Sequence, residues 1–216
     1  METYKLSPST LNLYAECQPC FWEHMHGNKR PAGKFSSLPS GMDKIFKQRF
    51  DAYRKRGEVP PELSSLENIS LFSNGKLLRE WQDQWKGIRW ANGNGHVLKG
   101  ALDEVLQSAA GELIVLDYKT RGFPLKETPT YYTLQLECYT LLLKKKGFPV
   151  TDHAYLLFYY PDAFTEQGEV KFHHRLLTMP VSVENAARTF ASALEVLSKE
   201  KPKLNQDCEF CVYKGK

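Results

Sequence analysis

The sequence has no long apolar run. None of its hydrophobic segments approaches the roughly 18 residues that a membrane-spanning helix needs. The first residues carry an acid at Glu2 and have no apolar stretch behind a basic one, which is not the pattern of a secretory signal. We therefore expect a cytoplasmic protein that makes no contact with a membrane.

Extremes of composition are also lacking. The chain has no internal repeat and no low-complexity segment, and its 216 residues are 42% hydrophobic and 25% charged. These proportions are typical of a globular protein, and the length suits one domain over residues 1–216. The net charge of +4 is small. It is compatible with a phosphate-bearing partner but does not require one.

Cysteines are few, and most of them lie at the ends of the chain. Four of the five form two Cys-x-x-Cys pairs: Cys17 with Cys20, and Cys208 with Cys211. In a reducing compartment we expect thiols or metal ligands rather than disulfides. Four thiolates suit Zn²⁺ or an iron–sulfur cluster, so segments 1–30 and 200–216 are predicted to form one metal site that joins the termini. Two separate pairs of thiols are the alternative.

The spacing of apolar residues predicts a mixture of helices and strands. The expected helices cover residues 10–17, 42–56, 131–146 and 183–198. The expected strands cover residues 97–106, 112–120, 154–160 and 170–177. Small residues at 108–111 predict a tight turn that makes the first two strands a hairpin. The order indicates an α/β or α+β fold with a mixed central sheet flanked by helices.

This hairpin is expected to bring three charged side chains together. Asp103 falls in its first strand, and Asp117 and Lys119 end its second. Residues two apart in a strand share a face, so Asp117 and Lys119 point to one side and Tyr118 to the other. Two carboxylates from adjacent strands form an oxygen site suited to Mg²⁺ or Mn²⁺. A lysine beside them can stabilise a phosphoryl transition state, so the pattern favours phosphodiester hydrolysis.

Three ordered motifs make the sequence resemble the PD-(D/E)XK nuclease superfamily and, within it, the RecB-type branch. The motifs are Gly100-Ala101-Leu102-Asp103, Asp117-Tyr118-Lys119 and Gln135-Leu136-Glu137-Cys138-Tyr139. The resemblance implies a restriction-endonuclease-like fold in which Asp103, Asp117 and the carbonyl of Tyr118 bind the metal. It also implies that Lys119 is catalytic and that Gln135 and Tyr139 orient the substrate or the lysine. Their spacing of four places these two residues on one helix face.

The N-terminal segment 7–17 and the cysteine-bearing tail resemble RecB-type nucleases whose termini are joined by a [4Fe–4S] cluster. These include helicase-associated repair nucleases and CRISPR-associated adaptation exonucleases. The resemblance implies a [4Fe–4S] cluster at the four cysteines, a substrate of single-stranded or end-containing DNA, and a helicase or a CRISPR or repair partner. Those nucleases pair one early cysteine with three late ones. This chain has two and two, so Zn²⁺ stays an alternative.

One ligand of the expected metal is not identified by the motifs. Many RecB-type nucleases carry a histidine four residues after a glycine on an early helix, whereas Ile45 stands four residues after Gly41 here. The residues that remain to fill the position are Asp43, Glu80, His24 and His26. Without this ligand, the alternative to a nuclease is a nucleic-acid-binding module that keeps the fold and the structural metal but lacks catalysis.

Several basic and aromatic residues are candidates for contacts with nucleic acid. Near-helical spacing relates Trp81, Trp85, Lys86, Arg89 and Trp90. The favoured interpretation is an amphipathic helix with its aromatic rings in the core, and the alternative is a surface on which unpaired bases stack. Basic side chains also gather elsewhere, at Lys29, Arg30, Lys34 and 144–146. Such residues either contact phosphates or are simply solvated.

Overall fold

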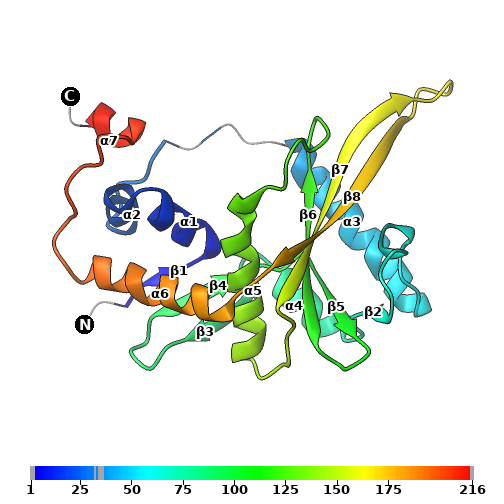
Figure 1. The fold of residues 1–216 in the computed structure, drawn as a ribbon, viewed down its shortest axis with the longest axis horizontal. Coiled ribbons are helices and arrows are strands. Elements are labelled where there is room, and N and C mark those ends of the chain that lie inside the picture. The colour runs from blue at the N-terminus through cyan, green and yellow to red at the C-terminus, as the bar shows by residue number, and fades with distance from the viewer. Residues whose placement is uncertain (1–2, 32, 34–36, 215–216) are drawn as a thin grey trace.

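The computed structural model describes residues 3–31, 33 and 37–214 and contains a five-stranded mixed sheet (Figure 1). Its strands, in spatial order, are β2 (Ile69–Leu71), β5 (Glu104–Ser108), β6 (Leu113–Thr120), β7 (His153–Phe164) and β8 (Val170–Pro180). Strands β6 and β7 are parallel, whereas the other three pairs are antiparallel. The predicted mixed α+β fold is confirmed, and β7 and β8 extend beyond the sheet as a long hairpin arm.

The predicted hairpin is present as β5 and β6, with Val105 opposite Val115 and Gly111 in the turn at φ +84°. However, the prediction of one strand over 97–106 is wrong. Residues 97–100 form β4 (Val97–Gly100) in a separate sheet of order β1–β4–β3, with β1 (Lys5–Leu6) and β3 (Ile88–Ala91). Residues 101–103 turn the chain from this sheet into the central one.

Close packing explains why the chain turns at this point. A Cβ atom built on Gly100 would lie 2.5 Å from Cε1 of Tyr139, so the backbone at this position lies directly against the tyrosine ring. The backbone N–H of Leu102 then donates to the carbonyl of Trp81 at 3.0 Å rather than to a strand of either sheet. These tertiary contacts are not visible in the apolar pattern of the segment.

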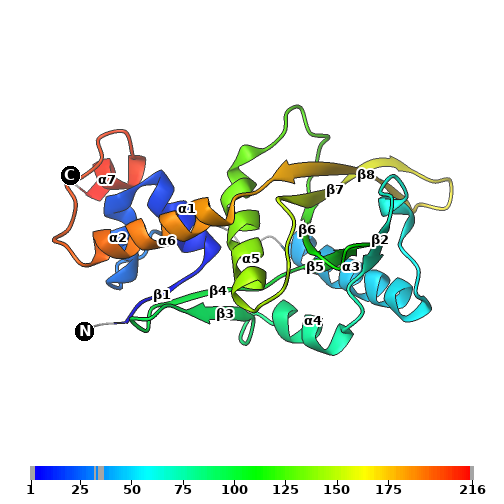
Figure 2. The same cartoon turned by 60° about the horizontal axis from the view of Figure 1, so that its bottom comes forward.

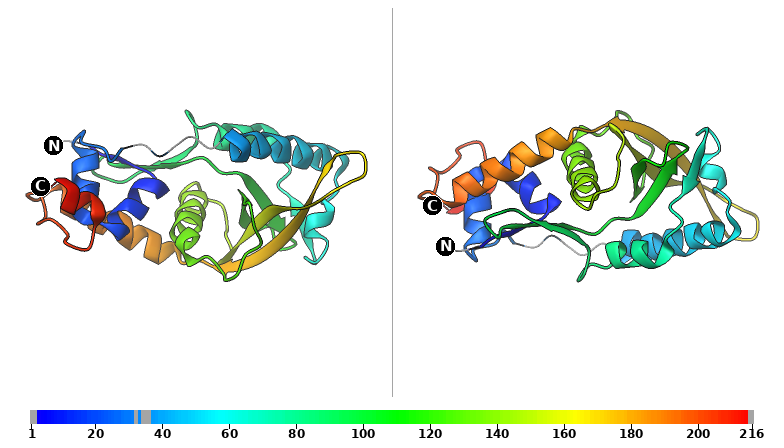
Figure 3. Two further views of the ribbon diagram at one scale, coloured as in Figure 1. Left: turned by 90° about the horizontal axis from the view of Figure 1, so that it is seen from above. Right: turned by 90° about the horizontal axis from the view of Figure 1, so that it is seen from below.

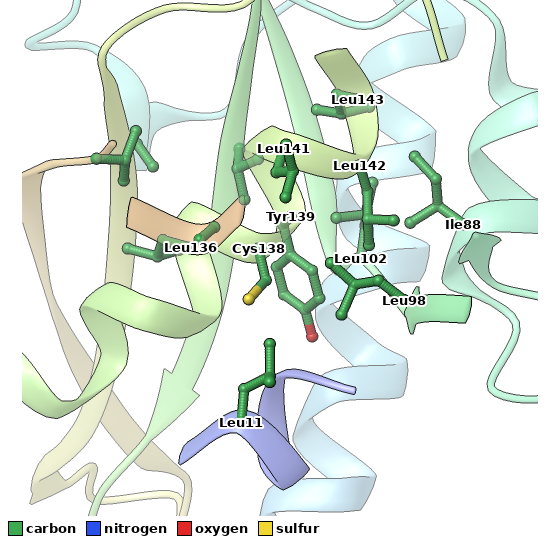
Figure 4. Packing of buried hydrophobic residues seen from close by; sticks show 14 of the residues in the cluster. Leu11, Ile88, Leu98, Leu102, Leu136, Cys138, Tyr139, Leu141, Leu142 and Leu143 are labelled. Carbon is green, nitrogen blue, oxygen red and sulfur yellow. The ribbon is translucent and has the colours of Figure 1, made fainter. Parts of the chain in front are cut away.

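Helices cover both faces of the central sheet (Figure 3). On one face, Leu116 and Tyr118 of β6 pack with Phe46 and Phe50 of α3 (Ser37–Arg56), which begins five residues before the predicted helix. The other face packs against α5 (Thr133–Lys145), which follows the short helix η2 (Thr130–Tyr132) and lies between the two sheets. Figure 4 shows Tyr139 of α5 within this second core, among the leucines that the picture labels.

The N-terminal and C-terminal segments lie together at one end of the molecule (Figure 2). The helices α1 (Pro8–Glu16), α2 (Gln18–Met25), α6 (Val183–Leu197) and α7 (Glu209–Lys214) gather there. A reciprocal cap starts α1, because the Ser7 hydroxyl accepts from the Thr10 amide at 3.3 Å and the Thr10 hydroxyl accepts from the Ser7 amide at 2.7 Å. The predicted helices over 10–17 and 183–198 are confirmed as α1 and α6.

The segment from 57 to 95 contains η1 (Pro61–Leu63), β2, α4 (Gly75–Gln82) and β3. A single helix through its tryptophans is wrong. The Asp83 carboxylate accepts the amides of Trp85 and Lys86 at 2.8 and 2.7 Å, and this turn separates α4 from β3. Trp81 is buried, whereas Trp85 is 89% exposed. In the described part of the chain, no helix is both long and apolar enough to cross a membrane.

Candidate active site and cysteine cluster

The two motif aspartates face each other across the β5–β6 hairpin. Glu104 pairs with Leu116 in the antiparallel register, and one further step places Asp103 opposite Asp117. Asp103 lies in the turn before β5 rather than inside a strand, contrary to the prediction. It still reaches β6, because its Oδ2 accepts the backbone N–H of Tyr118 at 3.0 Å. The predicted meeting of the two carboxylates is therefore confirmed.

Burial makes this pair of carboxylates difficult to keep charged. It raises the pKa of Asp103 to about 8, and the neighbouring Asp117 carboxylate adds to the rise. Burial also raises the pKa of Asp117, although the charge of Lys119 opposes the change. The buried Oδ2 of Asp117 forms an ion pair with Lys119 Nζ but accepts no regular hydrogen bond from the described residues. Two such carboxylates fit a divalent cation, which would favour their charged forms.

Lys119 contacts residues of the second and third motifs and the ring of Tyr132. Besides its ion pair with Asp117, its Nζ donates to Gln135 Oε1 at 3.3 Å and lies 4.5 Å from the centre of the Tyr132 ring. The Gln135 amide in turn donates to the Tyr139 hydroxyl at 3.0 Å. The structure thus brings all five predicted catalytic residues into one network and fixes the position of the lysine ammonium.

Helix α3 contributes a residue that the sequence motifs did not identify. Lys47 Nζ lies 3.5 Å from Asp103 Oδ1 and donates to Asp43 Oδ2 at 2.8 Å. Burial alone would lower the pKa of Lys47, but the carboxylates of Asp103 and Asp43 outweigh it and raise the pKa. The spacing of four between Asp43 and Lys47 was the available signal, because it places both residues on one helix face.

The other candidates for the open ligand position lie elsewhere. His26 follows α2, and its ring stacks on Trp22 at 3.6 Å between centroids. His24 is on the same short helix, near the terminal end of the molecule. Glu80, on α4, borders a surface pocket beside Phe148. Of the four candidates, Asp43 alone is linked to a motif aspartate, through Lys47.

A buried ion pair between α3 and β5 lies next to the site. Glu104, the residue after Asp103, is fully buried and paired with Arg54 of α3. The Tyr118 hydroxyl lies 3.4 Å from the same carboxylate, and Arg54 Nε donates to the Phe72 carbonyl at 2.8 Å. These contacts attach α3 to β5 next to Asp103, so they fix the distance between the helix and the carboxylates.

The four terminal cysteines form one cluster, as predicted. Their sulfur atoms all lie within 4.8 Å of one another, and all four side chains are buried. Individual Sγ–Sγ distances are 3.5 Å for Cys17–Cys211, 3.7 Å for Cys20–Cys208 and 3.5 Å for Cys20–Cys211. The cluster therefore has the donor set and spacing of a tetrathiolate metal site. Cys138 is not part of this cluster. It lies on α5 and is buried in the core that this helix forms with the sheets.

Arg30 lies against this cluster. Its Nη2 donates to Cys208 Sγ at 3.3 Å, its Nη1 is bound to Glu16 Oε1 at 2.6 Å, and the guanidinium stacks on Phe210 at 4.3 Å. Burial raises the pKa of Cys208, but the backbone amide of Cys211 and the other cysteines outweigh it and lower the pKa to about 7. Both features favour a thiolate at Cys208. Lys34, which shares this basic segment, is outside the described residues.

Comparison with known proteins identifies the class to which this fold and site belong. A family model of the PD-(D/E)XK nuclease superfamily matches residues 36–215, so the chain belongs to this superfamily. Its members are typically hydrolytic nucleases that use divalent metals, which indicates a nuclease-type function on DNA. A solved structure entitled "Crystal structure of SSO0001" is similar at 14% identity and a TM-score of 0.46, over 100% of this chain and 86% of that one. No curated protein matches.

Proposed function

We propose that the protein is a deoxyribonuclease of the RecB-type branch that hydrolyses phosphodiester bonds with Mg²⁺ or Mn²⁺. The observation that carries the proposal is the pair of adjacent carboxylates, the buried Asp117 and the partly buried Asp103, with the Lys119 ammonium beside Asp117. The carbonyl of Tyr118 completes the motif ligands. We propose single-stranded or end-containing DNA as the substrate. The proposed biological context is repair, recombination or CRISPR-type defence, with a helicase as partner.

Each residue of the network has a distinct task in this proposal. Asp103 and Asp117 hold the metal, which when bound polarises the scissile phosphate and makes a water molecule more acidic. Lys119 orients the attacking water and offsets the negative charge that develops on the phosphoryl oxygens. Gln135 keeps the lysine in place from α5, and the Tyr139 hydroxyl accepts from Gln135. The lysine is thus positioned before substrate binds.

Asp43 is the residue that we propose for the open ligand position. Lys47 joins it to Asp103, and the Asp43 side chain is 40% exposed, so it can move toward the carboxylate pair. A carboxylate from an early helix would supply a hard oxygen ligand where related nucleases have a histidine nitrogen. Both ligand types are compatible with Mn²⁺, whereas an all-oxygen set suits Mg²⁺ as well.

The cysteine cluster is proposed to bind a [4Fe–4S] cluster or Zn²⁺ and to hold residues 1–216 together as one cytoplasmic unit. Its support is the proximity of segments that are 188 to 194 residues apart in the chain. Anaerobic purification followed by visible spectroscopy and elemental analysis separates the two metals. Iron and sulfide in a brown sample would select the cluster, and one zinc per chain would select Zn²⁺.

A cleavage assay tests the catalytic proposal. Purified protein with Mg²⁺ or Mn²⁺ is expected to cut labelled DNA, and Lys119→Ala is expected to reduce the rate at least about 100-fold, as loss of a transition-state donor does. Lys199→Ala, on the exposed surface at the end of α6, serves as the matched control. Unchanged cleavage by Lys119→Ala would refute the assigned role. DNA binding without cleavage by the wild-type protein would favour the non-catalytic binding module.

A further inference from the structure

The loop between β6 and α5 forms a pocket at the end of the strand that carries Asp117 and Lys119. The pocket has a volume of about 940 Å³ and is bounded along residues 121–131, in a loop that Figure 1 shows where β6 ends. The loop starts two residues after Lys119. It ends at Tyr131, next to Tyr132, whose ring contacts the Lys119 ammonium. The pocket is therefore connected to the Lys119 ammonium through the adjacent rings of Tyr131 and Tyr132.

Two aromatic side chains of the pocket are largely exposed to solvent. Phe123 is 80% exposed and Tyr131 is 59% exposed. Tyr131 is nevertheless held in position, because its ring lies 4.2 Å from the Tyr132 ring and its hydroxyl is 3.3 Å from Nη1 of Arg121. Large aromatic rings exposed together at one pocket are uncommon unless they bind something. Their free faces suit a flat, aromatic ligand.

The charges of the pocket favour an anionic ligand. Among the described residues that line it, Arg121 and Lys126 are basic and Glu127 is acidic. Arg121 is attached to Tyr131, so a positive charge lies directly at the edge of an aromatic surface. This combination of stacking surface and cation is the one that proteins use for single-stranded nucleic acid, where bases stack on rings and phosphates contact Arg or Lys.

We infer that this pocket binds an unpaired nucleotide next to the scissile phosphate, with its base stacked on Phe123 or Tyr131 and its phosphate against Arg121 or Lys126. The inference rests on the proposed function and deepens it. A base inside a duplex has both of its faces covered by neighbouring pairs, so it has no face to offer to these rings. The pocket thus selects single-stranded over double-stranded DNA.

Binding to non-cleaving protein separates this inference from catalysis. The full chain carrying Asp117→Asn is titrated with a fluorescent thymidine oligonucleotide and with a duplex of equal length. Adding Phe123→Ala and Tyr131→Ala is expected to weaken single-strand binding roughly 5- to 100-fold, the range of base–aromatic stacking, and to change duplex binding far less. Both side chains are exposed, so their replacement leaves the core intact. Phe164→Ala, at the end of β7 and 76% exposed, is the matched control.

Two further measurements identify the interaction itself. The fluorescence of an oligonucleotide with one 2-aminopurine base is expected to be quenched on binding. Phe123→Trp is expected to keep the quenching, whereas replacement of both Phe123 and Tyr131 with leucine is expected to abolish it. Arg121→Ala is expected to lower the slope of log affinity against log salt by about 0.7, the value for one phosphate contact in a single strand.

The outcomes are distinguishable from failure of the proposed function. Equal loss of single-strand and duplex affinity in the double variant, or unchanged single-strand affinity, would refute nucleotide binding in the pocket. Neither result would bear on the proposed nuclease activity. Wild-type protein that binds single strands through Phe123 or Tyr131 but never cleaves them would support the pocket and refute the proposed nuclease activity. A pocket occupied by a protein partner predicts no stacking signal with any oligonucleotide, which also overturns the inference.

Discussion

Replacing Gly100 with alanine tests how closely the active site depends on the packing of Tyr139. The added Cβ would lie 2.5 Å from Cε1 and 3.0 Å from Cδ1 of the ring, whereas ordinary contact begins at 3.4 Å. The ring or the strand must therefore move by about 0.9 Å. The ring has little freedom to move, because Tyr139 is buried and its hydroxyl is bound by Gln135.

Two effects are expected from this movement. Overpacking of this kind costs about 1–3 kcal/mol of unfolding free energy. The displaced Tyr139 also shifts Gln135, which holds Lys119, and a misplacement of about 1 Å at a catalytic group can reduce the rate about 100-fold. Denaturation in urea measures the first effect, and cleavage of a labelled single strand in saturating Mn²⁺ measures the second.

Gly93→Ala is the matched control for this substitution. Its Cβ would meet nothing within 4 Å, and its backbone is not left-handed, so both stability and cleavage should stay at wild-type values. Ordinary surface substitutions change the free energy of unfolding by less than about 0.5 kcal/mol. The reasoning is refuted if the unfolding free energies of Gly100→Ala and Gly93→Ala differ by less than this amount and Gly100→Ala cleaves DNA at the wild-type rate.

Three further predictions concern the cysteine cluster and the Arg54–Glu104 ion pair. Arg30→Met is expected to speed the loss of metal from the cysteine cluster to a chelator, as measured by elemental analysis, whereas the control Lys29→Met is not. Equal metal retention by the two variants would show that the guanidinium does not stabilise the site. Cys208→Ser is expected to lower the melting temperature because the cluster joins distant segments, and an unchanged temperature would contradict a structural role. Arg54→Met leaves Glu104 buried and unpaired and is expected to cost about 3–5 kcal/mol in urea denaturation, whereas a loss below about 1 kcal/mol would contradict the pairing.

The features that could be predicted from the sequence are those that depend on local geometry. Alternation along a strand placed Asp117 and Lys119 on one face, and a spacing of four placed Gln135 and Tyr139 on one turn of a helix. The structure brings these four side chains into contact. The Cys-x-x-Cys pairs could be combined into one site because four thiolates complete a metal shell, without any knowledge of the path between them.

The features that could not be predicted depend on contacts between distant segments. Lys47 and Arg54 lie on a helix about 50 residues before Asp103 and Glu104. The sequence alone does not show which face of this helix packs against the sheet. The division of 97–106 into two strands follows from the packing of Gly100 on α5. Exposure of Trp85 follows from the turn that Asp83 stabilises, which interrupts an otherwise helical spacing.

The most direct test of the central claim is the cleavage rate of Asp117→Asn relative to wild type, on a labelled single strand in saturating Mn²⁺. The substitution keeps the shape of the side chain but removes the charge that pairs with Lys119 and that we propose binds the metal. We predict a rate at least about 100-fold lower with the fold intact by circular dichroism, comparable to the loss of other charge-stabilising groups. Cleavage at the wild-type rate by the folded variant would show that the carboxylate pair is not the active site.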